Sequence, residues 1–483
     1  MNDNQTLLFY DLETSGINNS FDQVLQFAAV RTDMDFNEIE RFNFFVKLNP
    51  DTTPSPKATT VHHISIAQAN SEGVSEYQAI LDIHQIINVP GTISIGYNTL
   101  GFDDEFLRFA FHKNMLPPYN HQFKNDCYRA DLFPIVTCYY LFFKEALQWP
   151  TVLDKDGKQR VSLKLENINS LNVLHEGGRA HDAITDVLVT VELAKKLYNS
   201  NPKMWSFLMT KFVKKEDEDL LGQLDVGIEV NGFKYKQAIA ISGIFGYKNN
   251  YMSAVLDLGV HRHYKNQEIF IRLDSQLFSD MIEKNGSLEK EHWRLTIAKK
   301  WGDTPIILPA KSRFVGKLPQ ERLDLIKSNK KFIKNNYDVF ANFVDFVLDY
   351  KHSPIENVDC NADIYQSGFM TSADARGCDK FHGLDITNKA KMLSKLPKNY
   401  YERALRIIGR LDFSKLPEIS QQEFQEYLNN VANLDGEVFF MDHRGKPRVS
   451  LPEIYEQMQD LRVYESLTEE QNNLLDELEH YLY

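Results

Sequence analysis

The chain begins with a short apolar segment that ends in two closely spaced carboxylates. Residues 6–10 read TLLFY, and Asp11-Leu12-Glu13 follows directly. An apolar run of this length is typical of a buried strand. Side chains at positions i and i+2 of a strand lie on the same face, and adjacent carboxylates repel each other unless a cation lies between them. The pattern therefore favours a site for a hard metal ion. The alternative is a strand that ends in solvated acids.

The first 200 residues combine strand and helix patterns. Residues 23–32 and 41–48 are rich in β-branched and aromatic side chains and predict two more strands, and residues 92–96 predict a fourth. Apolar residues at helical spacing predict helices over residues 76–88, 103–113, 131–143, 163–174 and 182–198. We therefore expect an α/β domain over residues 1–200. Its first three strands should be antiparallel and its later strands parallel, with helices over the faces.

The remainder divides into a β-rich part and a helical part. Residues 214–219 are charged and indicate a linker or an exposed turn. Short β-like runs over residues 221–315 predict a small barrel-like module, and the pattern becomes helical from about residue 319. A polar stretch at residues 352–358 marks a second boundary. The expected domains are residues 1–200, 201–352 and 353–483.

Composition limits the class of protein. Hydrophobic residues make up 43% of the chain, which excludes a disordered protein. The four cysteines have neither metal-site nor disulfide spacing, so a cytoplasmic location is expected. No apolar run is long enough to indicate a membrane-spanning helix. The net charge of −13 argues against coating nucleic acid by charge alone. However, residues 201–350 carry +4 between flanks of −9 and −8, a candidate electrostatic footprint.

Two further segments place polar side chains at element ends. After the strand over residues 92–96, Asp103 opens a helix, where it is either a functional carboxylate or a simple N-cap. Asp104 and Glu105 are interpreted as first-turn acids that complement the helix dipole. Downstream, His181 lies at a loop-to-helix junction and Asp186 one turn into the helix.

Together these segments predict a two-metal site. Asp11, Glu13 and Asp186 can hold one Mg²⁺, and Asp11 with Asp103 a second. Two metal ions about 4 Å apart stabilise the attacking and leaving oxygens of a phosphoryl displacement. His181 is the expected general base, because imidazole titrates near neutral pH. Asp182 is interpreted as a helix cap.

The ordered set of an Asp-x-Glu pair, a helix-start Asp and His-x4-Asp resembles the DEDD exonuclease superfamily, and its last motif marks the DEDDh branch. Five further segments are similar to the bacterial exodeoxyribonuclease I family: QFAAVRTD at residues 26–33, residues 96–104, residues 180–186, NVD at residues 357–359 and YQSGF at residues 365–369. The resemblance extends over the whole chain.

This resemblance implies a fold and an activity. The expected architecture is a ribonuclease-H-like exonuclease domain, an SH3-like β domain and a helical C-terminal domain, arranged as a C-shaped clamp. The implied enzyme is a monomer with a role in DNA repair. It degrades single-stranded DNA processively from the 3′ end to 5′-mononucleotides. It uses two Mg²⁺ ions, for which Mn²⁺ can substitute, and binds the acidic tail of the single-stranded-DNA-binding protein.

The resemblance also implies substrate contacts. Glu13 is expected to contact substrate, Lys164 replaces a substrate-binding arginine, and Ile64 is expected to wedge against the terminal base. Ile64 lies in His62-His63-Ile64, where relatives have a glycine in the middle position, which leaves the local turn in question. Weaker expectations for the strand channel are Arg108, Tyr119, Phe123 and Arg129. A basic run is expected either to follow phosphates, to accept a partner's acidic tail, or to form a solvated helix face: Lys327, Lys330, Lys331 and Lys334.

Two other functions remain open from the sequence. One is an RNA-directed or proofreading nuclease of the same branch, against which the long extension beyond residue 200 argues. The other is a catalytically inactive protein that binds single-stranded DNA, against which the presence of all five catalytic positions argues.

Overall fold

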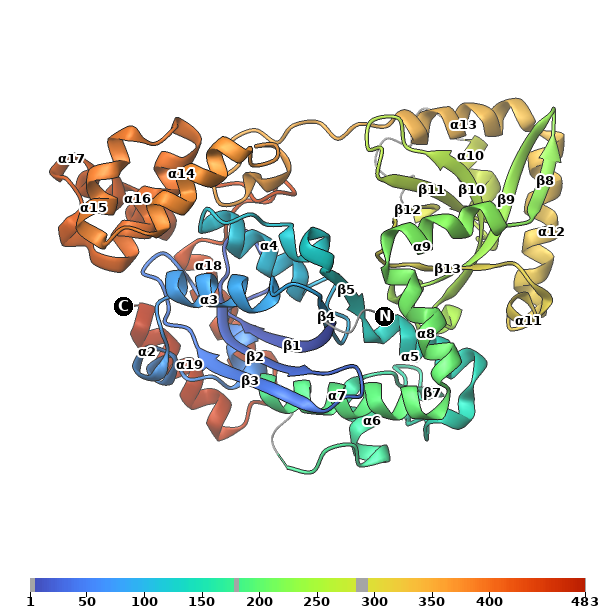
Figure 1. Cartoon of the computed structure of the whole chain (residues 1–483), viewed down its shortest axis with the longest axis horizontal. Coiled ribbons are helices and arrows are strands. Elements are labelled where there is room, and N and C mark those ends of the chain that lie inside the picture. The colour runs from blue at the N-terminus through green and yellow to red at the C-terminus, as the bar shows by residue number, and fades with distance from the viewer. Residues whose placement is uncertain (1–4, 178–181, 284–293, 483) are drawn as a thin grey trace. The chain divides into compact units, whose positions relative to one another are not determined.

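The computed structural model describes residues 5–177, 182–283 and 294–482, and they form two compact units (Figure 1). The first unit comprises Met1–Tyr128, Glu176–Val191 and Pro354–Tyr483. The second comprises Arg129–His175 and Glu192–Ser353. Each unit combines segments that are distant in the sequence, so neither coincides with one of the three consecutive domains expected. That three-part division stays a prediction.

Four strands of a five-stranded mixed sheet form the centre of the first unit, and the fifth, β5, begins at the last residue of that unit's first segment. The strand order is β3-β2-β1-β4-β5. β1 pairs antiparallel with β2 and parallel with β4, and β2 pairs antiparallel with β3. The expected antiparallel start and later parallel strand are therefore confirmed. The bounds are Thr6–Thr14 for β1, Val24–Thr32 for β2, Glu38–Phe45 for β3, Thr92–Gly96 for β4 and Tyr128–Asp131 for β5.

Two helices cover one face of this sheet, as Figure 1 shows. They are α3 (Glu76–Ile87) and α4 (Asp103–Lys113). Inward side chains of β1 and β2, such as Leu8 and Phe27, form one buried cluster with Ile80 of α3. α4 contributes aromatic side chains to the same cluster. The apolar faces that predicted these elements therefore pack against one another.

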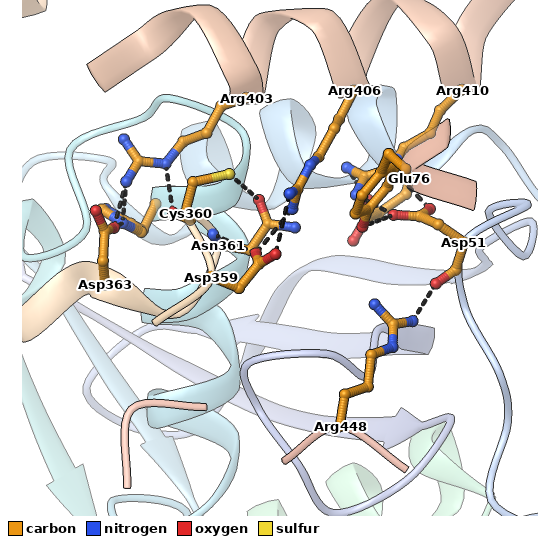
Figure 2. Close-up of polar contacts among 12 residues, drawn as sticks. Asp51, Glu76, Asp359, Cys360, Asn361, Asp363, Arg403, Arg406, Arg410 and Arg448 are labelled. Atoms are coloured by element: carbon orange, nitrogen blue, oxygen red, sulfur yellow. Dashed lines mark hydrogen bonds and ion pairs between the residues drawn. The ribbon is translucent and has the colours of Figure 1, made fainter. Parts of the chain in front are cut away.

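The C-terminal helices of the first unit are attached by a row of buried ion pairs. Arginines at i, i+3 and i+7 of α16 share one helix face. Figure 2 shows that each meets a carboxylate from another segment: Arg403 with Asp363, Arg406 with Asp359, and Arg410 with Asp51. The helix bounds are Ser372–His382 for α14, Ile386–Met392 for α15, Lys398–Asp412 for α16, Glu418–Ala432 for α17, Leu451–Tyr464 for α18 and Glu469–Leu482 for α19.

The last two helices pack on the segment that follows β3. This segment contains α1 (Pro56–His62) and α2 (Ile66–Glu72). Ile66 is buried with apolar residues of α18 and α19. Glu477 of α19 accepts a hydrogen bond from Ser65 Oγ at 2.8 Å. The last two helices therefore stabilise a helical segment that lies early in the sequence.

The second unit is built on an antiparallel sheet. Its strand order is β12-β11-β10-β9-β13, with β8 paired to β9. The strands are Val226–Val230 (β8), Phe233–Ile241 (β9), Met252–Val260 (β10), Gln267–Arg272 (β11), Thr296–Lys300 (β12) and Ile306–Pro309 (β13). A small hairpin is formed by β6 (Thr151–Leu153) and β7 (Gln159–Val161). The expected small β module is therefore present.

Helices complete the second unit. Its helices are α5 (Leu132–Phe142), α6 (Leu165–Asn172), α8 (Pro202–Met209), α9 (Lys214–Glu218), α10 (Phe278–Glu283), α11 (Ser312–Val315), α12 (Gln320–Asn335) and α13 (Tyr337–Asp349). Helix α7 (Ala183–Ser200) begins in the first unit and ends in the second.

The expected linker over residues 214–219 is wrong. This segment forms α9, and Asp217 is fully buried. The Asp217 carboxylate lies 2.5 Å from Lys299 Nζ and accepts a hydrogen bond from the Gly302 amide at 2.9 Å. A charged side chain can be buried when an opposite charge lies beside it, and here Lys299 of the distant strand β12 supplies that charge.

Among the described helices, none is long and apolar enough to cross a membrane.

Candidate active site

The carboxylates of β1 meet the first turn of α7. Asp11 and Glu13 lie opposite Ala28 and Gln26 of β2. One carboxylate oxygen each of Asp11, Glu13 and Asp186 lies within 4.8 Å of the other two. A divalent ion prefers such carboxylate oxygens. The donor set therefore fits the hard cation expected at this strand end.

The charges of this cluster are not balanced by the side chains within it. The pKa of Asp11 is raised well above its usual value, first by burial and then by the Asp103 and Glu13 carboxylates. Burial, Asp186 and Asp103 raise the pKa of Glu13 to about 9. Nearby negative charge disfavours ionisation of a carboxyl group. A bound cation would remove this repulsion, so the electrostatics also fit a metal site.

Asp103, in the first turn of α4, acts electrostatically on the cluster, but it is not among the described carboxylates that lie within 4.8 Å of one another. The N-cap residue of this helix is Phe102, and no side-chain hydrogen bond caps the helix. Asp103 is therefore the first helical residue, and the alternative interpretation of its carboxylate as an N-cap is wrong. Its effect on Asp11 is the largest of any charged neighbour.

The third sequence segment is described in part. His181 lies outside the described residues. Asp182 directly precedes α7 and accepts hydrogen bonds from Thr185 Oγ1 at 2.8 Å and from Gln26 Nε2 at 3.2 Å. These bonds agree with the structural role expected for Asp182. They also tie the start of α7 to the second strand of the sheet.

Beside Asp103, the first turn of α4 contains a buried polar cluster that the sequence did not predict. Asp104 is fully buried, and its Oδ1 lies 2.8 Å from Nε2 of His121, which is also fully buried. Arg108 Nε lies 3.3 Å from Asp104 Oδ2. Asp104 therefore does more than complement the helix dipole. Three consecutive acids at the helix start were the only sequence signal, and no pattern pointed to His121.

The channel residues expected in the first unit differ in exposure. Arg108 is 6% exposed, pairs with Asp104 and Glu105, and lies 5.9 Å from the centre of the Tyr119 ring. Phe123 is 70% exposed. Ile64 is 6% exposed and packs in a small apolar cluster, so its surface for a terminal base is small. Their substrate roles stay predictions.

The other two expected substrate residues belong to the second unit. Lys164 immediately precedes α6, and its exposed side chain lies 3.1 Å from Glu166. Arg129 is mostly buried and pairs with Asp303 at 3.1 Å. Both cations thus already have an anionic neighbour, but the Lys164 side chain is exposed whereas Arg129 is mostly buried.

Comparisons with known proteins extend these observations to the whole chain. Residues 8–194 match the model of a family described as Exonuclease. The chain is 30% identical over 461 residues to exodeoxyribonuclease I of Escherichia coli (strain K12). That match covers 89% of this chain and 91% of the relative.

Solved structures of exonuclease I also match this chain over nearly its whole length. The zinc-bound E. coli ExoI–ssDNA complex matches with a TM-score of 0.82 and 25% identity, over 99% of this chain and 98% of that one. A structure of SSB/Exonuclease I in complex with the inhibitor CFAM matches with a TM-score of 0.80 and 25% identity. It covers 99% of both chains.

Proposed function

Because the chain belongs to the exodeoxyribonuclease I family, we propose that it degrades single-stranded DNA from the 3′ end and releases 5′-mononucleotides. The protein has the ribonuclease-H-like exonuclease fold of that family, together with a β-rich module and a helical C-terminal part. Processive action in DNA repair, in the cytoplasm and as a monomer, is part of the proposal.

One observation carries the proposal. Carboxylate oxygens of Asp11, Glu13 and Asp186 converge within 4.8 Å at the end of β1, and Asp103 acts electrostatically on the same cluster. A buried concentration of negative charge is costly without a cation. The cluster therefore supports a divalent-metal-dependent phosphodiesterase.

We assign the metal ligands as follows. Asp11, Glu13 and Asp186 would hold one Mg²⁺, and Asp11 with Asp103 a second. Mn²⁺ prefers similar oxygen ligands and would substitute. When bound, such ions polarise the phosphate, lower the pKa of water and neutralise the leaving oxygen.

The protein's own groups would position the substrate and move the proton. The water oxygen would bond to phosphorus as the bond from phosphorus to O3′ breaks. The water proton would pass to His181 as general base, and O3′ would take up a proton from solvent to become the 3′-hydroxyl of the shortened strand. Lys164 would contact a phosphate with a single ammonium group, without the two-pronged geometry of arginine. Tyr119 and Phe123 would stack on bases. Ile64, Arg108 and Arg129 remain proposed neighbours of the strand.

We also propose that the acidic tail of a single-stranded-DNA-binding protein docks on this chain. A structure containing such a protein with Exonuclease I supports this partner. The lysines of α12 provide the basic surface: Lys327, Lys331 and Lys334 are exposed at i, i+4 and i+7, while Lys330 is half-buried beside Gln237.

The proposed activity is tested with 5′-labelled oligonucleotides. Single-stranded DNA should shorten progressively from its 3′ end in Mg²⁺, and EDTA should abolish the reaction. Asp11→Asn should lower kcat by several orders of magnitude, because Asp11 belongs to both metal sites, while binding of single-stranded DNA survives. A gel of the labelled products and a fluorescence binding assay in EDTA measure the two effects.

Two comparisons make this test decisive. Single-stranded RNA and duplex DNA should be degraded slowly or not at all, and an equal rate on RNA would favour an exoribonuclease. Asp460→Asn changes an exposed acid of α18 and should leave the rate unchanged. Intact single-stranded DNA at saturating Mg²⁺ and Mn²⁺ would refute the proposed function.

A further inference from the structure

The carboxylate of Asp103 depends on how the first turn of α4 is oriented. Asp103 and Asp104 are consecutive helical residues, so their side chains leave the helix about 100° apart. Any rotation of the helix start that moves one carboxylate moves the other. The helix lacks a side-chain N-cap that would otherwise hold its first turn.

The Asp104 side chain is held by a histidine from outside the helix. His121 lies in a short 3₁₀ turn (Asn120–Gln122), and its Nε2 lies 2.8 Å from Asp104 Oδ1. Both side chains are fully buried. An ionised carboxylate only accepts hydrogen bonds, so the imidazole N–H donates. Arg108, one turn along α4, lies 3.3 Å from the other carboxylate oxygen.

An aromatic side chain of α4 packs against His121. The His121 ring packs edge-on against Phe111 of α4, with ring centroids 5.8 Å apart. On the neighbouring position of the first turn, Glu105 pairs with Arg108 and accepts a hydrogen bond from Tyr365 Oη at 2.7 Å. Both acids that follow Asp103 therefore have polar partners. Of the two, only Asp104 has a fully buried partner, His121.

We propose that His121 is a positioning residue: through its hydrogen bond to Asp104 it sets the direction of the Asp103 carboxylate toward Asp11. This inference rests on the proposed metal-dependent function. Groups that orient metal ligands typically affect metal affinity or activity by about 10–100-fold when removed. His121 therefore determines metal binding without itself touching metal or DNA.

A pair of variants with the same amide group tests this role. In His121→Gln the amide nitrogen takes the place of Nε2, whereas in His121→Asn the side chain is one methylene shorter and does not reach Asp104. We expect His121→Asn to weaken Mn²⁺ binding about tenfold and to raise the Mg²⁺ concentration for half-maximal activity by a similar factor. His121→Gln should stay within about threefold of the parent on both measures. Calorimetry measures Mn²⁺ binding independently of activity.

Two controls separate positioning from loss of stability. His84→Asn removes a different half-buried histidine, whose Nε2 lies 3.2 Å from the Pro117 carbonyl oxygen and whose ring also packs on Phe111. This variant should leave Mn²⁺ affinity unchanged. Binding of single-stranded DNA in EDTA should remain within twofold for all three variants.

The outcomes distinguish the inference from the proposed function. If His121→Asn and His121→Gln bind Mn²⁺ like the parent, or if His84→Asn weakens binding equally, the positioning role is wrong. If the parent binds Mn²⁺ but degrades no DNA, the proposed function fails while the calorimetric comparison still tests His121.

Discussion

At the scale of single residues, His63 adopts the left-handed backbone conformation at the end of α1. His63 ends α1 with φ 58° and ψ 20°. The family resemblance implied a glycine here, and its absence left the turn in question. The structure shows that the turn forms with histidine in the conformation that glycine adopts most easily. A non-glycine residue in this region costs about 1 kcal/mol.

Replacing this residue should therefore reveal the strain. His63→Gly is expected to raise the free energy of unfolding by about 0.5–1 kcal/mol, because glycine adopts the left-handed region without a Cβ clash. The lost contact between His63 and Glu470, at 3.6 Å, contributes little because Glu470 is exposed. Urea denaturation measures the change. His63→Ala keeps the strain, so a glycine variant no more stable than the alanine variant would contradict this account.

At the scale of elements, α16 shows how a helix can be attached through charge. Arg406 donates to both oxygens of Asp359, at 2.7 and 2.9 Å, and both residues are buried. Arg410 makes the same two-pronged contact with Asp51, at 2.9 and 2.6 Å (Figure 2). Removing one partner of a buried pair leaves an uncompensated charge and costs about 3–5 kcal/mol. The helix is therefore sensitive to each of its counter-ions.

Neutralising one counter-ion should destabilise the protein in a pH-dependent way. Burial alone would raise the pKa of Asp359, but Arg406 outweighs it and holds the pKa below 3.8. The stabilisation is thus present above pH 3.8 and is lost as the pH falls through the lower folded-state value. Asp359→Asn should cost about 3–5 kcal/mol at pH 7 and progressively less in acid.

Denaturation with urea at several pH values measures this difference. Asp460→Asn, at an exposed position of α18, should change stability by less than about 0.5 kcal/mol at every pH. A constant penalty for Asp359→Asn down to strong acid would show that the loss arises from packing and not from the ion pair.

At the scale of the whole molecule, charge is distributed unevenly along the chain. The net charge is −13, yet residues 201–350 carry +4. Part of the negative charge belongs to the carboxylate cluster at the end of β1 and to acids that pair with the arginines of α16. The exposed lysines of α12 lie in this more basic stretch, and Lys327 already pairs with Asp324 of the same helix at 3.2 Å.

This distribution predicts separate effects on partner binding and on catalysis. The triple variant Lys327→Glu, Lys331→Glu, Lys334→Glu should weaken binding of an acidic C-terminal peptide of the single-stranded-DNA-binding protein at least tenfold. Activity on free oligonucleotides should change little. Fluorescence anisotropy of a labelled peptide measures the first effect. Lys195→Glu, Lys196→Glu and Lys203→Glu, on α7 and α8, together provide a charge-matched control, and equal loss of binding in that control would exclude a specific α12 site.

The sequence alone determined the local elements and the chemistry at their ends. The strand over residues 92–96 and the helix over residues 103–113 have the predicted bounds. The pairing of Asp11 with Glu13 follows from the two-residue period of a strand. These features depend on neighbouring residues, which a linear pattern records directly.

The tertiary structure decided which buried charges meet. Nothing near Asp217 in the sequence indicated Lys299, and nothing near Asp104 indicated His121. The packing of the C-terminal helices on α3 and on the segment after β3 also depends on partners hundreds of positions apart, such as Arg410 and Asp51. A local pattern reports whether a side chain is polar, whereas a buried charge is stable only beside its partner. That partner is specified by the path of the whole chain.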